Sequence, residues 1–516
     1  MESSRSFARH LISHSSINSI ATSGCTASDP ANSIFTLRGQ SSTFHWIESP
    51  VKEIKSCLSP DLEDEERKTC RFYAAVIDAG STGTRLHLFE FSHDTNHEHS
   101  PFKVENEIFN EIKPGLSSFA SEPENAAVSI RGLISAAREV VPVHLWSHTP
   151  IVMKATAGLR LLPGDQADGI LKEVEAEIQK SGLLMDDESV GILSGTDEGV
   201  YGWFTLNFLT DKLRYLKQNV KKTSVALDLG GGSTQITFIP ENPSRVFTDQ
   251  TPEKDFGHTL KVFGNEIRLF THSYLGNGLV ASRLGIGRLL ATEQSDNQHK
   301  MITHCFPANY TLKDWDYAGN AWTISATPES SYANCLKSTK QYVKKMNVQR
   351  VAEIDEREIH AFAYFYDRAE QAGLLEGFEG KGKWIRVGDF AEVARHVCSL
   401  TATEIGTEHW RPWQCLDLSY IYTLLHDGYG LNDDKLIHPT KKVDGYECSW
   451  ALGAGYHLLN TYHERSQRPS TDGSCQEPMK AENRTLVNST TQYIAQIYDY
   501  LSGKATELLT VFRLIS

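Results

Sequence analysis

The stretch Ala75-Val-Ile-Asp-Ala-Gly-Ser-Thr-Gly-Thr-Arg85 decides how the rest of the chain is interpreted. An apolar run ends at the carboxylate of Asp78, and a loop of small residues follows it. The glycines allow close backbone approach to a ligand, and the hydroxyl groups of Ser81, Thr82 and Thr84 can donate hydrogen bonds to phosphate oxygens. Taken alone, such a loop is more typical of a plain hairpin turn.

A second stretch, Val225-Ala-Leu-Asp-Leu-Gly-Gly-Gly-Ser-Thr-Gln235, repeats this order of apolar run, aspartate, spacer, glycine and small hydroxyl residues. The repeat favours ligand binding for both loops and predicts two related half-molecules. If the strands that carry the loops face each other, the backbone N–H groups surround a phosphate chain. Asp78 and Asp228 would then hold Mg²⁺ or Ca²⁺ through bound water, because hard divalent cations prefer oxygen ligands.

The composition is that of a globular protein. The chain has 516 residues, of which 40% are hydrophobic and 22% charged, so it is long enough for two large domains. The formal net charge of -14 argues against non-specific nucleic-acid binding, whereas a local nest and a metal still permit an anionic ligand. No stretch approaches the ~18 apolar residues that a transmembrane helix needs, so none is expected.

The cysteines and glycosylation motifs indicate an oxidising compartment. None of the nine cysteines forms a Cys-x-x-Cys pair, which disfavours a zinc ribbon. Spacing suggests pairing of Cys305 with Cys335 and of Cys398 with Cys415, although the sequence alone leaves the pairing open. Three N-glycosylation acceptors point the same way and lie at Asn309, Asn483 and Asn488.

We therefore expect a location in the secretory pathway, in the endoplasmic reticulum lumen, the Golgi or the extracellular space. Residues 1–45 show no basic n-region followed by the roughly 7 to 15 apolar residues of a signal peptide. Either the chain enters this route unconventionally or another start is used, and we favour a start altered by splicing or by the gene model.

Hydrophobic patterning along the chain predicts alternating strands and helices. Strands are expected at residues 72–77, 86–91, 151–155 and 190–193. Helices are expected at residues 124–141, 168–180, 201–209, 351–372 and 450–459. The composition of residues 1–71 predicts a mobile tail. That of residues 465–516 predicts a linker or tail with a peripheral helix at 493–515.

The pair Asp197-Glu198 is the best candidate for proton chemistry, because phosphoanhydride hydrolysis needs a carboxylate to orient and deprotonate water. Acidic residues at a helix start can instead merely complement the helix dipole. Thr156, Gly158 and Arg160 follow a strand and open a helix, which is a natural anion site, but singly each is more typical of an ordinary helix start.

Five blocks of sequence occur in the order typical of one enzyme family and cover roughly residues 72 to 462. They are Asp78-Ala-Gly-Ser-Thr-Gly-Thr-Arg85, Lys154-Ala-Thr-Ala-Gly-Leu-Arg160, Ser194-Gly-Thr-Asp-Glu-Gly-Val-Tyr-Gly-Trp203, Leu227-Asp-Leu-Gly-Gly-Gly-Ser-Thr-Gln235 and Trp450-Ala-Leu-Gly-Ala-Gly455. Jointly they resemble the nucleoside triphosphate diphosphohydrolases, the apyrase family of the superfamily that includes actin, sugar kinases and heat-shock chaperones.

Two further phrases, Thr271-His-Ser-Tyr-Leu-Gly276 and Asp417-Leu-Ser-Tyr-Ile421, are most similar to the soluble subgroup. That subgroup comprises ectonucleoside triphosphate diphosphohydrolases 5 and 6 and includes an endoplasmic reticulum uridine diphosphatase. The resemblance implies an α/β fold of two actin-like domains, related to ribonuclease H, with a nucleotide cleft between them. The first domain would contain residues 72–193 and 449–464, and the second residues 194–448.

The resemblance also implies residue roles. Glu198 would be the general base, and Asp78 and Asp228 would hold Ca²⁺ or Mg²⁺ through water. The expected contacts to phosphate, water or nucleotide are Gly80, Ser81, Thr82, Gly83, Thr84, Arg85, Thr156, Gly231, Gly232, Ser233 and Gln235, with Tyr274 and Tyr420 near the nucleoside. The family pattern supports the two cysteine pairs as well.

The expected function is metal-dependent removal of the terminal phosphate from nucleoside diphosphates, UDP and GDP first. Alternatives are a broad apyrase acting on di- and triphosphates, an exopolyphosphatase or sugar kinase of the same superfamily, and a non-enzymatic nucleotide-dependent chaperone. The block from Asp197 to Trp203 favours the nucleotidase. The sequence contains no Gly-x-x-x-x-Gly-Lys-Ser/Thr motif, which disfavours a P-loop enzyme.

Overall fold

A computed structural model describes residues 69–94, 103–262, 265–291, 296, 298–317, 319–378 and 380–466. All of them belong to one compact unit, residues 1–466. The helix expected at 493–515 and the acceptors Asn483 and Asn488 lie outside the described residues. The first strand begins at Thr69, because residues 69–71 pair with residues 92–94, so the tail predicted to reach residue 71 ends earlier.

The first large sheet has five strands in the order β3-β2-β1-β4-β5. They are β1 (Thr69–Ala79), β2 (Thr84–Asp94), β3 (Lys103–Ile112), β4 (Ile151–Ala155) and β5 (Val190–Ile192). Strands β1, β2 and β3 pair antiparallel, whereas β4 and β5 run parallel to β1. Strand β1 reads as a continuous apolar run because both of its faces are buried, with Ala75 and Ile77 in one core and Ala74 and Val76 in another.

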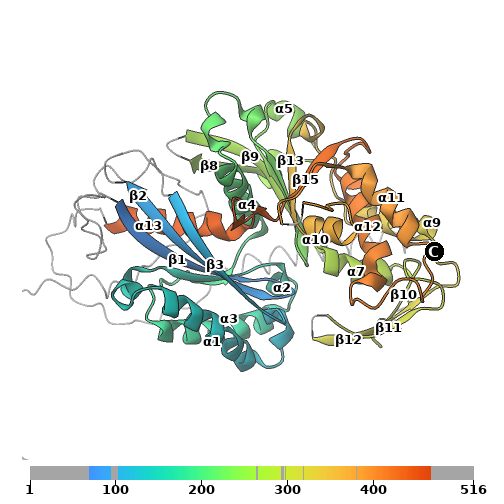
Figure 1. Ribbon diagram of the computed structural model, residues 1–516, viewed down its shortest axis with the longest axis horizontal. Coiled ribbons are helices and arrows are strands. Elements are labelled where there is room, and N and C mark those ends of the chain that lie inside the picture. Colours follow the sequence, from blue (N-terminus) through green and yellow to red (C-terminus); the bar gives the residue numbers. More distant parts are fainter. Residues whose placement is uncertain are drawn as a thin grey trace, which may run out of the picture. The chain divides into compact units, whose positions relative to one another are not determined.

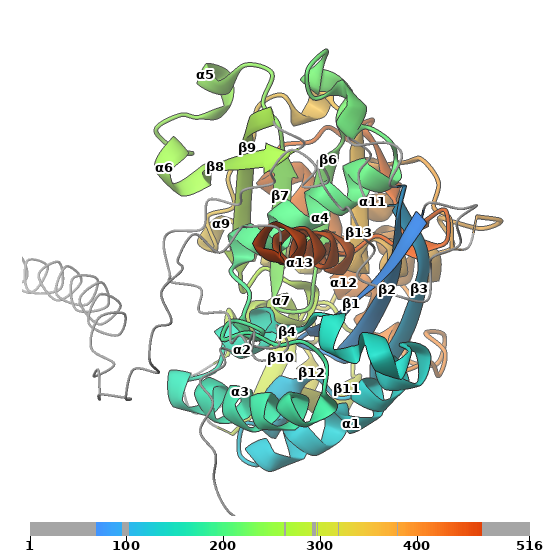
Figure 2. The ribbon, with the colours of Figure 1, turned by 90° about the vertical axis from the view of Figure 1, so that its left-hand side faces the viewer.

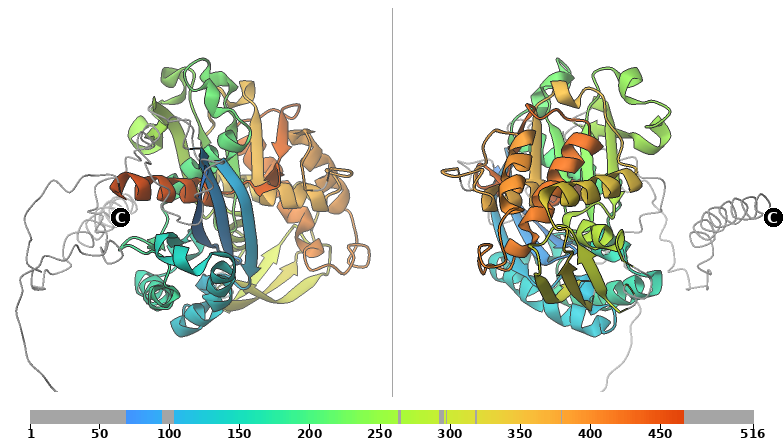
Figure 3. Two further views of the ribbon diagram at one scale, coloured as in Figure 1. Left: turned by 60° about the vertical axis from the view of Figure 1, so that its left-hand side comes forward. Right: turned by 90° about the vertical axis from the view of Figure 1, so that its right-hand side faces the viewer.

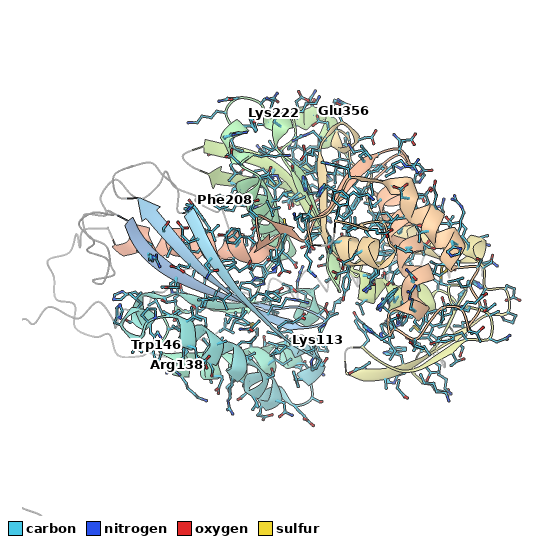
Figure 4. All side chains as sticks on the ribbon, viewed as in Figure 1. Lys113, Arg138, Trp146, Phe208, Lys222 and Glu356 are labelled. Atoms are coloured by element: carbon cyan, nitrogen blue, oxygen red, sulfur yellow. A yellow bond between two sulfur atoms is a disulfide. The ribbon has the colours of Figure 1, made fainter. Side chains whose placement is uncertain are left out.

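Helices α1 (Pro123–Val140) and α3 (Gly164–Ile178) lie side by side against one face of this sheet (Figure 1). Their buried residues recur every three or four positions and complete the core with β1 and β2. Helix α3 ends in a short 3-10 turn before Gly182, whose left-handed φ of 76° terminates the helix. At the far end of α1, the guanidinium of Arg138 lies 4.1 Å from the centre of the Trp146 ring (Figure 4).

The second large sheet has seven strands in the order β14-β15-β13-β6-β7-β9-β8. They are β6 (Val225–Leu229), β7 (Ser233–Phe238), β8 (Gly257–Val262), β9 (Asn265–Leu275), β13 (Ile359–Ala363), β14 (Ile385–Arg386) and β15 (Leu436–Pro439). Its core is shared with helices α7 (Leu279–Arg288), α9 (Tyr332–Lys345), α10 (Tyr364–Gln371), α11 (Val387–Val397) and α12 (Gln414–Thr423). The short helices α5 (Pro243–Val246) and α6 (Glu253–Phe256) precede β8.

The two sheets repeat one connectivity. The order β9-β7-β6-β13-β15 has the same parallel and antiparallel pairings as β3-β2-β1-β4-β5. Asp78 pairs with Arg85 across the first hairpin, and Asp228 pairs with Gln235 across the second. The two glycine-rich loops therefore occupy equivalent positions, which confirms the two related halves expected from the sequence.

Two helices lie where the halves meet. Helix α4 (Gly195–Leu209) follows β5 of the first half but packs against β6, β7 and β9, whereas α13 (Trp450–Ser466) packs against β1 and β2. The two helices also contact each other (Figure 2). All residues of α4 from Glu198 to Asn207 are buried, because neighbours surround this segment. The domain bounds given above remain a prediction.

A smaller sheet, yellow in Figure 3, is inserted between α7 and α9. It contains β10 (Lys300–Thr303), β12 (Asn320–Ala326) and β11 (Thr311–Tyr317), and the disulfide Cys305–Cys335 ties it to α9. The disulfide Cys398–Cys415 joins the end of α11 to the start of α12. Both disulfides match the sequence prediction. Strands β16 (Lys442–Val443) and β17 (Tyr446–Glu447) form a hairpin before α13.

The helix predicted at 351–372 is wrong in its first half. A 3-10 turn at Ile354–Glu356 precedes strand β13, and only α10, from Tyr364 to Gln371, is helical. Strand β13 runs between β6 and β15, so Ile359 to Phe362 are all buried and show no strand alternation. None of the helices in the described ranges is both long and apolar enough to cross a membrane.

Candidate active site

The first glycine-rich loop joins β1 to β2, and the Arg85 side chain packs against it. The Arg85 guanidinium lies 3.7 Å from the Asp78 carboxylate and 2.8 Å from the Glu111 carboxylate. A Cβ atom on Gly80 would lie 2.9 Å from Nη1 of Arg85. Arg85 is therefore paired with carboxylates beside the loop, and the phosphate contact expected from the sequence stays a prediction.

The two loops touch each other and the start of α2 (Ala157–Arg160). A Cβ atom on Gly231 would lie 2.1 Å from the Ser81 hydroxyl oxygen, and one on Gly232 would lie 2.7 Å from Cβ of Ala157. Gly158 is equally close, since its Cβ would lie 2.8 Å from Cα of Ser81. The structure thus brings together the loop residues and the helix start that the sequence nominated.

Two further glycines, to which the sequence assigned no role, pack closely against the backbones of the two loops. Gly115 follows β3, and a Cβ atom there would lie 2.5 Å from the Gly80 carbonyl oxygen. Gly278 follows β9, and a Cβ atom there would lie 2.4 Å from the backbone nitrogens of Gly232 and Ser233. Strands β3 and β9 occupy equivalent places in the two sheets, so the support repeats with the fold.

Three carboxylates gather beside the loops. Burial raises the pKa of Glu198 to about 7, with a further contribution from the charge of Asp78 and an opposing one from Arg160. Burial also raises the pKa of Asp228 to about 8, aided by Glu198 and Asp78. The pKa of Asp78 is raised mainly by burial. The three groups thus disfavour one another's negative charge.

This donor set fits a divalent cation. The Oδ1 atom of Asp78 is buried and accepts no hydrogen bond from the described residues. Carboxylate oxygens are the ligands that Mg²⁺ and Ca²⁺ prefer, and a cation beside Asp78 and Asp228 would offset their mutual repulsion. The side chain of Trp450, the first residue of α13, lies near the Asp78 carboxyl and lowers its pKa. Sequence reasoning named the Trp450 block but not this contact.

The Glu198 side chain is held by two donors, and its residue is only 7% exposed. Nε2 of Gln235 donates to Oε2 of Glu198 over 2.9 Å, and the Arg160 guanidinium donates to the same oxygen. Gln235 also contacts the hydroxyls of Ser233 and Ser273 at 2.8 and 2.9 Å. The sequence predicted Glu198 and Gln235 as site residues, but it did not identify Arg160 as the partner of Glu198.

Asp197 and Glu198 are adjacent in sequence but lie in different surroundings. Asp197 lines a cavity of about 480 Å³ with Lys154 and Tyr201, and neither glycine-rich loop contributes to its lining. Burial raises the pKa of Asp197 to about 6. The Ser194 hydroxyl caps α4 by accepting a hydrogen bond from the Asp197 backbone N–H over 3.0 Å, which fixes the turn that presents Glu198.

Some residues that the sequence predicted to contact phosphate or nucleoside are buried or covered by other residues in this structure. Thr84 is fully buried, and Gly83 is covered by Glu111 and Ile112. Tyr274 is 5% exposed, and its hydroxyl accepts a hydrogen bond from the backbone N–H of Gln349.

Tyr420 is fully buried and donates to the Asn277 carbonyl over 2.6 Å. Both tyrosines nominated for the nucleoside are therefore buried in this structure, and their place near the nucleoside stays a prediction. The hydroxyl of Tyr364, a residue that sequence reasoning missed, lies 3.5 Å from the Thr82 hydroxyl. Tyr364 follows β13 as Thr156 follows β4, and φ of 56° at the preceding Ala363 directs the chain into α10.

The profile of the GDA1/CD39 (nucleoside phosphatase) family matches residues 63–470, so the chain belongs to this family. It is therefore an enzyme of the phosphoanhydride hydrolase class, and the resemblance stated from the sequence blocks is confirmed.

Three individual proteins are similar to most of this chain. The chain is 43% identical over 460 residues to the nucleoside-diphosphatase uda-1 of Caenorhabditis elegans, covering 87% of this chain and 92% of that protein. It is 38% identical over 392 residues to the human nucleoside diphosphate phosphatase ENTPD5, covering 75% and 88%. It is 35% identical over 434 residues to rat ectonucleoside triphosphate diphosphohydrolase 6, covering 84% and 90%.

A solved structure shows the same fold. The crystal structure of nucleoside triphosphate hydrolases from Neospora caninum superposes with a TM-score of 0.55 at 14% identity and covers 79% of this chain and 96% of that chain. Together with the repeated sheets, it establishes the actin-like α/β fold expected from the sequence.

Proposed function

We propose that the protein hydrolyses the terminal phosphate of nucleoside diphosphates, with UDP and GDP preferred, and that it requires Mg²⁺ or Ca²⁺. The observation that carries the proposal is the position of Glu198, buried beside two equivalent glycine-rich loops and two aspartates. The loops offer N–H donors to phosphate, the aspartates suit a cation, and the glutamate can take a proton.

Each residue has a separate task in the proposed reaction. The backbones of the loops at 80–82 and 230–233 bind the terminal phosphate, and Ser81, Thr82 and Ser233 add hydroxyl donors. Asp78 and Asp228 hold the cation, which when bound would neutralise charge on the phosphate oxygens. Glu198 aligns a water molecule in line with the leaving oxygen and accepts its proton, while Gln235 orients the carboxylate. No phosphoenzyme is required.

The choice of substrate rests on the similar proteins. Two of them are named for nucleoside diphosphate hydrolysis, the proteins from Caenorhabditis elegans and human. Their similarity over three quarters or more of this chain supports diphosphates as the first substrates to test. The preference for UDP and GDP follows from the resemblance of the sequence to the soluble subgroup.

Phosphate release is the direct test. The purified protein would be assayed with UDP, GDP, ADP, UTP, ATP and polyphosphate, each with Mg²⁺, Ca²⁺ or chelator. We expect fastest release from UDP and GDP and loss of activity with chelator. Release from polyphosphate alone, or release that is indifferent to chelator, would contradict the proposal. Nucleotide binding without turnover would favour a chaperone-like protein.

We also propose that the protein resides in the secretory pathway. Two disulfides in the second half support an oxidising compartment, and the acceptor Asn309 is exposed on the loop before β11. Digestion of the native protein with an N-glycosidase should increase its electrophoretic mobility. Blocking thiols in denaturant without reductant should leave Cys305, Cys335, Cys398 and Cys415 unmodified. A protein with reduced cysteines and no glycan would contradict this location.

A further inference from the structure

Arg160 belongs to the first half of the chain, but its guanidinium reaches the second half. It lies at the end of α2, next to the helix start that touches the first glycine-rich loop. Its Nη2 donates to Oε2 of Glu198, and its Nη1 lies 3.5 Å from the Ser273 hydroxyl on β9. The Arg160 side chain is 14% exposed, so this ion pair is largely shielded from water.

Gly195 makes room for this guanidinium. It is the first residue of α4, three positions before Glu198. A Cβ atom on Gly195 would lie 2.3 Å from Cβ of Ser273 and 2.6 Å from Nη1 of Arg160. Any larger residue would have to displace the arginine, the serine or the first turn of α4.

The two donors to Glu198 bind the same oxygen. Both Arg160 and Gln235 donate to Oε2, and within the described part of the chain no donor reaches Oε1. Two donors on one oxygen fix the rotation of the carboxylate and leave the lone pairs of the other oxygen for water. The geometry therefore distinguishes a held oxygen from a reacting one.

We propose that Arg160 is a positioning residue for hydrolysis, which holds Oε2 of Glu198 so that Oε1 faces the attacking water, and that Gly195 is required for it to do so. This inference rests on the proposed role of Glu198 as the base. In this role Arg160 acts through Glu198, so removing it should lower the rate of the chemical step and leave substrate affinity nearly unchanged. The positive charge also opposes the effect of burial on the pKa of Glu198, which favours the carboxylate form.

The test compares steady-state hydrolysis of UDP with Mg²⁺ by Arg160→Ala, Arg160→Lys and Gly195→Ala. For Arg160→Ala we expect kcat to fall by about 10²-fold, the size found when one preorganised donor is removed, with KM within about threefold. Added guanidinium chloride at non-denaturing concentration should restore part of kcat. Arg160→Lys should keep more activity than Arg160→Ala, because the ammonium group supplies one charged donor.

The variant Gly195→Ala tests the positioning of Glu198 by Arg160 without removing the arginine. We expect a fall in kcat with nearly constant KM and no rescue by guanidinium, because the added methyl group occupies the same space. Gly164→Ala is the matched control, since Gly164 is likewise the first residue of a helix and a Cβ atom there meets nothing within 4 Å. Arg131→Ala is the control for losing an arginine–glutamate pair, because Arg131 pairs with Glu177 on the exposed side of α1 and α3.

The outcomes separate this inference from the proposed function. If Glu198→Gln is inactive while Arg160→Ala and Gly195→Ala keep wild-type kcat, the inference is wrong and the base assignment stands. A rise in KM with unchanged kcat would make Arg160 a substrate ligand and would also overturn it. If Glu198→Gln retains full activity, the proposed base itself is wrong. Should Arg160→Ala fail to fold, Arg160→Lys and Gly195→Ala decide the question by the same kcat and KM criteria.

Discussion

Replacing Gly278 by alanine should damage the second phosphate loop without touching any proposed catalytic group. Gly278 caps the N-terminus of α7 with φ of −68°, a value open to any residue, so the change adds a methyl group and no backbone strain. That methyl carbon would start 2.4 Å from the backbone nitrogens of Gly232 and Ser233. These are the nitrogens that we propose to bind phosphate.

The structure sets the size of the displacement. Carbon atoms of this type essentially never approach other atoms closer than 3.0 Å, so the loop or α7 must retreat by about 0.6 Å, the difference between 3.0 and 2.4 Å. Reaching a relaxed contact of 3.4 Å requires a shift of about 1.0 Å. A misplacement of roughly 1 Å in a reacting geometry can reduce the rate by about 10²-fold. We therefore expect kcat/KM for UDP to fall by between about 10-fold and 10²-fold.

The assay is phosphate release at saturating Mg²⁺, accompanied by the Tm of each variant. Gly132→Ala on α1 is the control, because a Cβ atom at Gly132 meets nothing within 4 Å and alanine favours the helix by about 0.5–1 kcal/mol. The control should keep full activity and a slightly higher Tm. Gly278→Ala with wild-type kcat/KM would refute the assignment of the 232–233 backbone to phosphate binding.

Three further results are expected. Burial raises the pKa of Glu198 to about 7, and a general base acts only when it is ionised. The value of kcat/KM should therefore fall as the pH drops below about 7 and level off above it. A pH profile that is flat from about pH 5 to 9 would contradict this. Trp450→Phe removes the indole N–H near Asp78 and should weaken Mg²⁺ activation by about 10-fold or more in a metal titration. Unchanged activation would show that this N–H does not orient the aspartate. The double variant Cys398→Ser and Cys415→Ser removes a disulfide whose cysteines are 17 residues apart in the sequence. It should lower the free energy of unfolding by about 3 kcal/mol, measured by denaturant titration. An unchanged denaturation midpoint would argue against a stabilising disulfide.

Much of the fold could be predicted from local pattern. The continuous apolar runs before Asp78 and Asp228 predicted buried strands, and the repeated Asp-x-Gly order predicted two equivalent halves. The helix predicted at 351–372 failed in its first half because β13 is buried on both faces and lacks the alternation that identifies a strand.

The supports of the candidate site could not be predicted, because they are tertiary contacts. The pairing of Arg160 with Glu198 joins residues on different halves, and the contact of Gly278 with Gly232 depends on how β9 returns to the loop. Tyr420 was nominated from its place in a family phrase, but burial is a property of the folded chain, and this side chain lies wholly inside. The acidic pattern alone did not distinguish Asp197 from Glu198, and only the family resemblance assigned the base to Glu198. The orientation of α4 then places the two side chains in different surroundings.

The most direct test of the central claim is phosphate release from UDP by Glu198→Gln, with Asp197→Asn as the matched control on the neighbouring carboxylate. Both changes keep side-chain size, and circular dichroism would establish that both proteins are folded. The account predicts that Glu198→Gln loses activity by about 10²-fold to 10⁴-fold, the contribution of a general base, while Asp197→Asn stays within a few-fold of wild type. Unimpaired turnover by Glu198→Gln, or an equal loss in Asp197→Asn, would contradict the assignment of Glu198 as the residue that activates water.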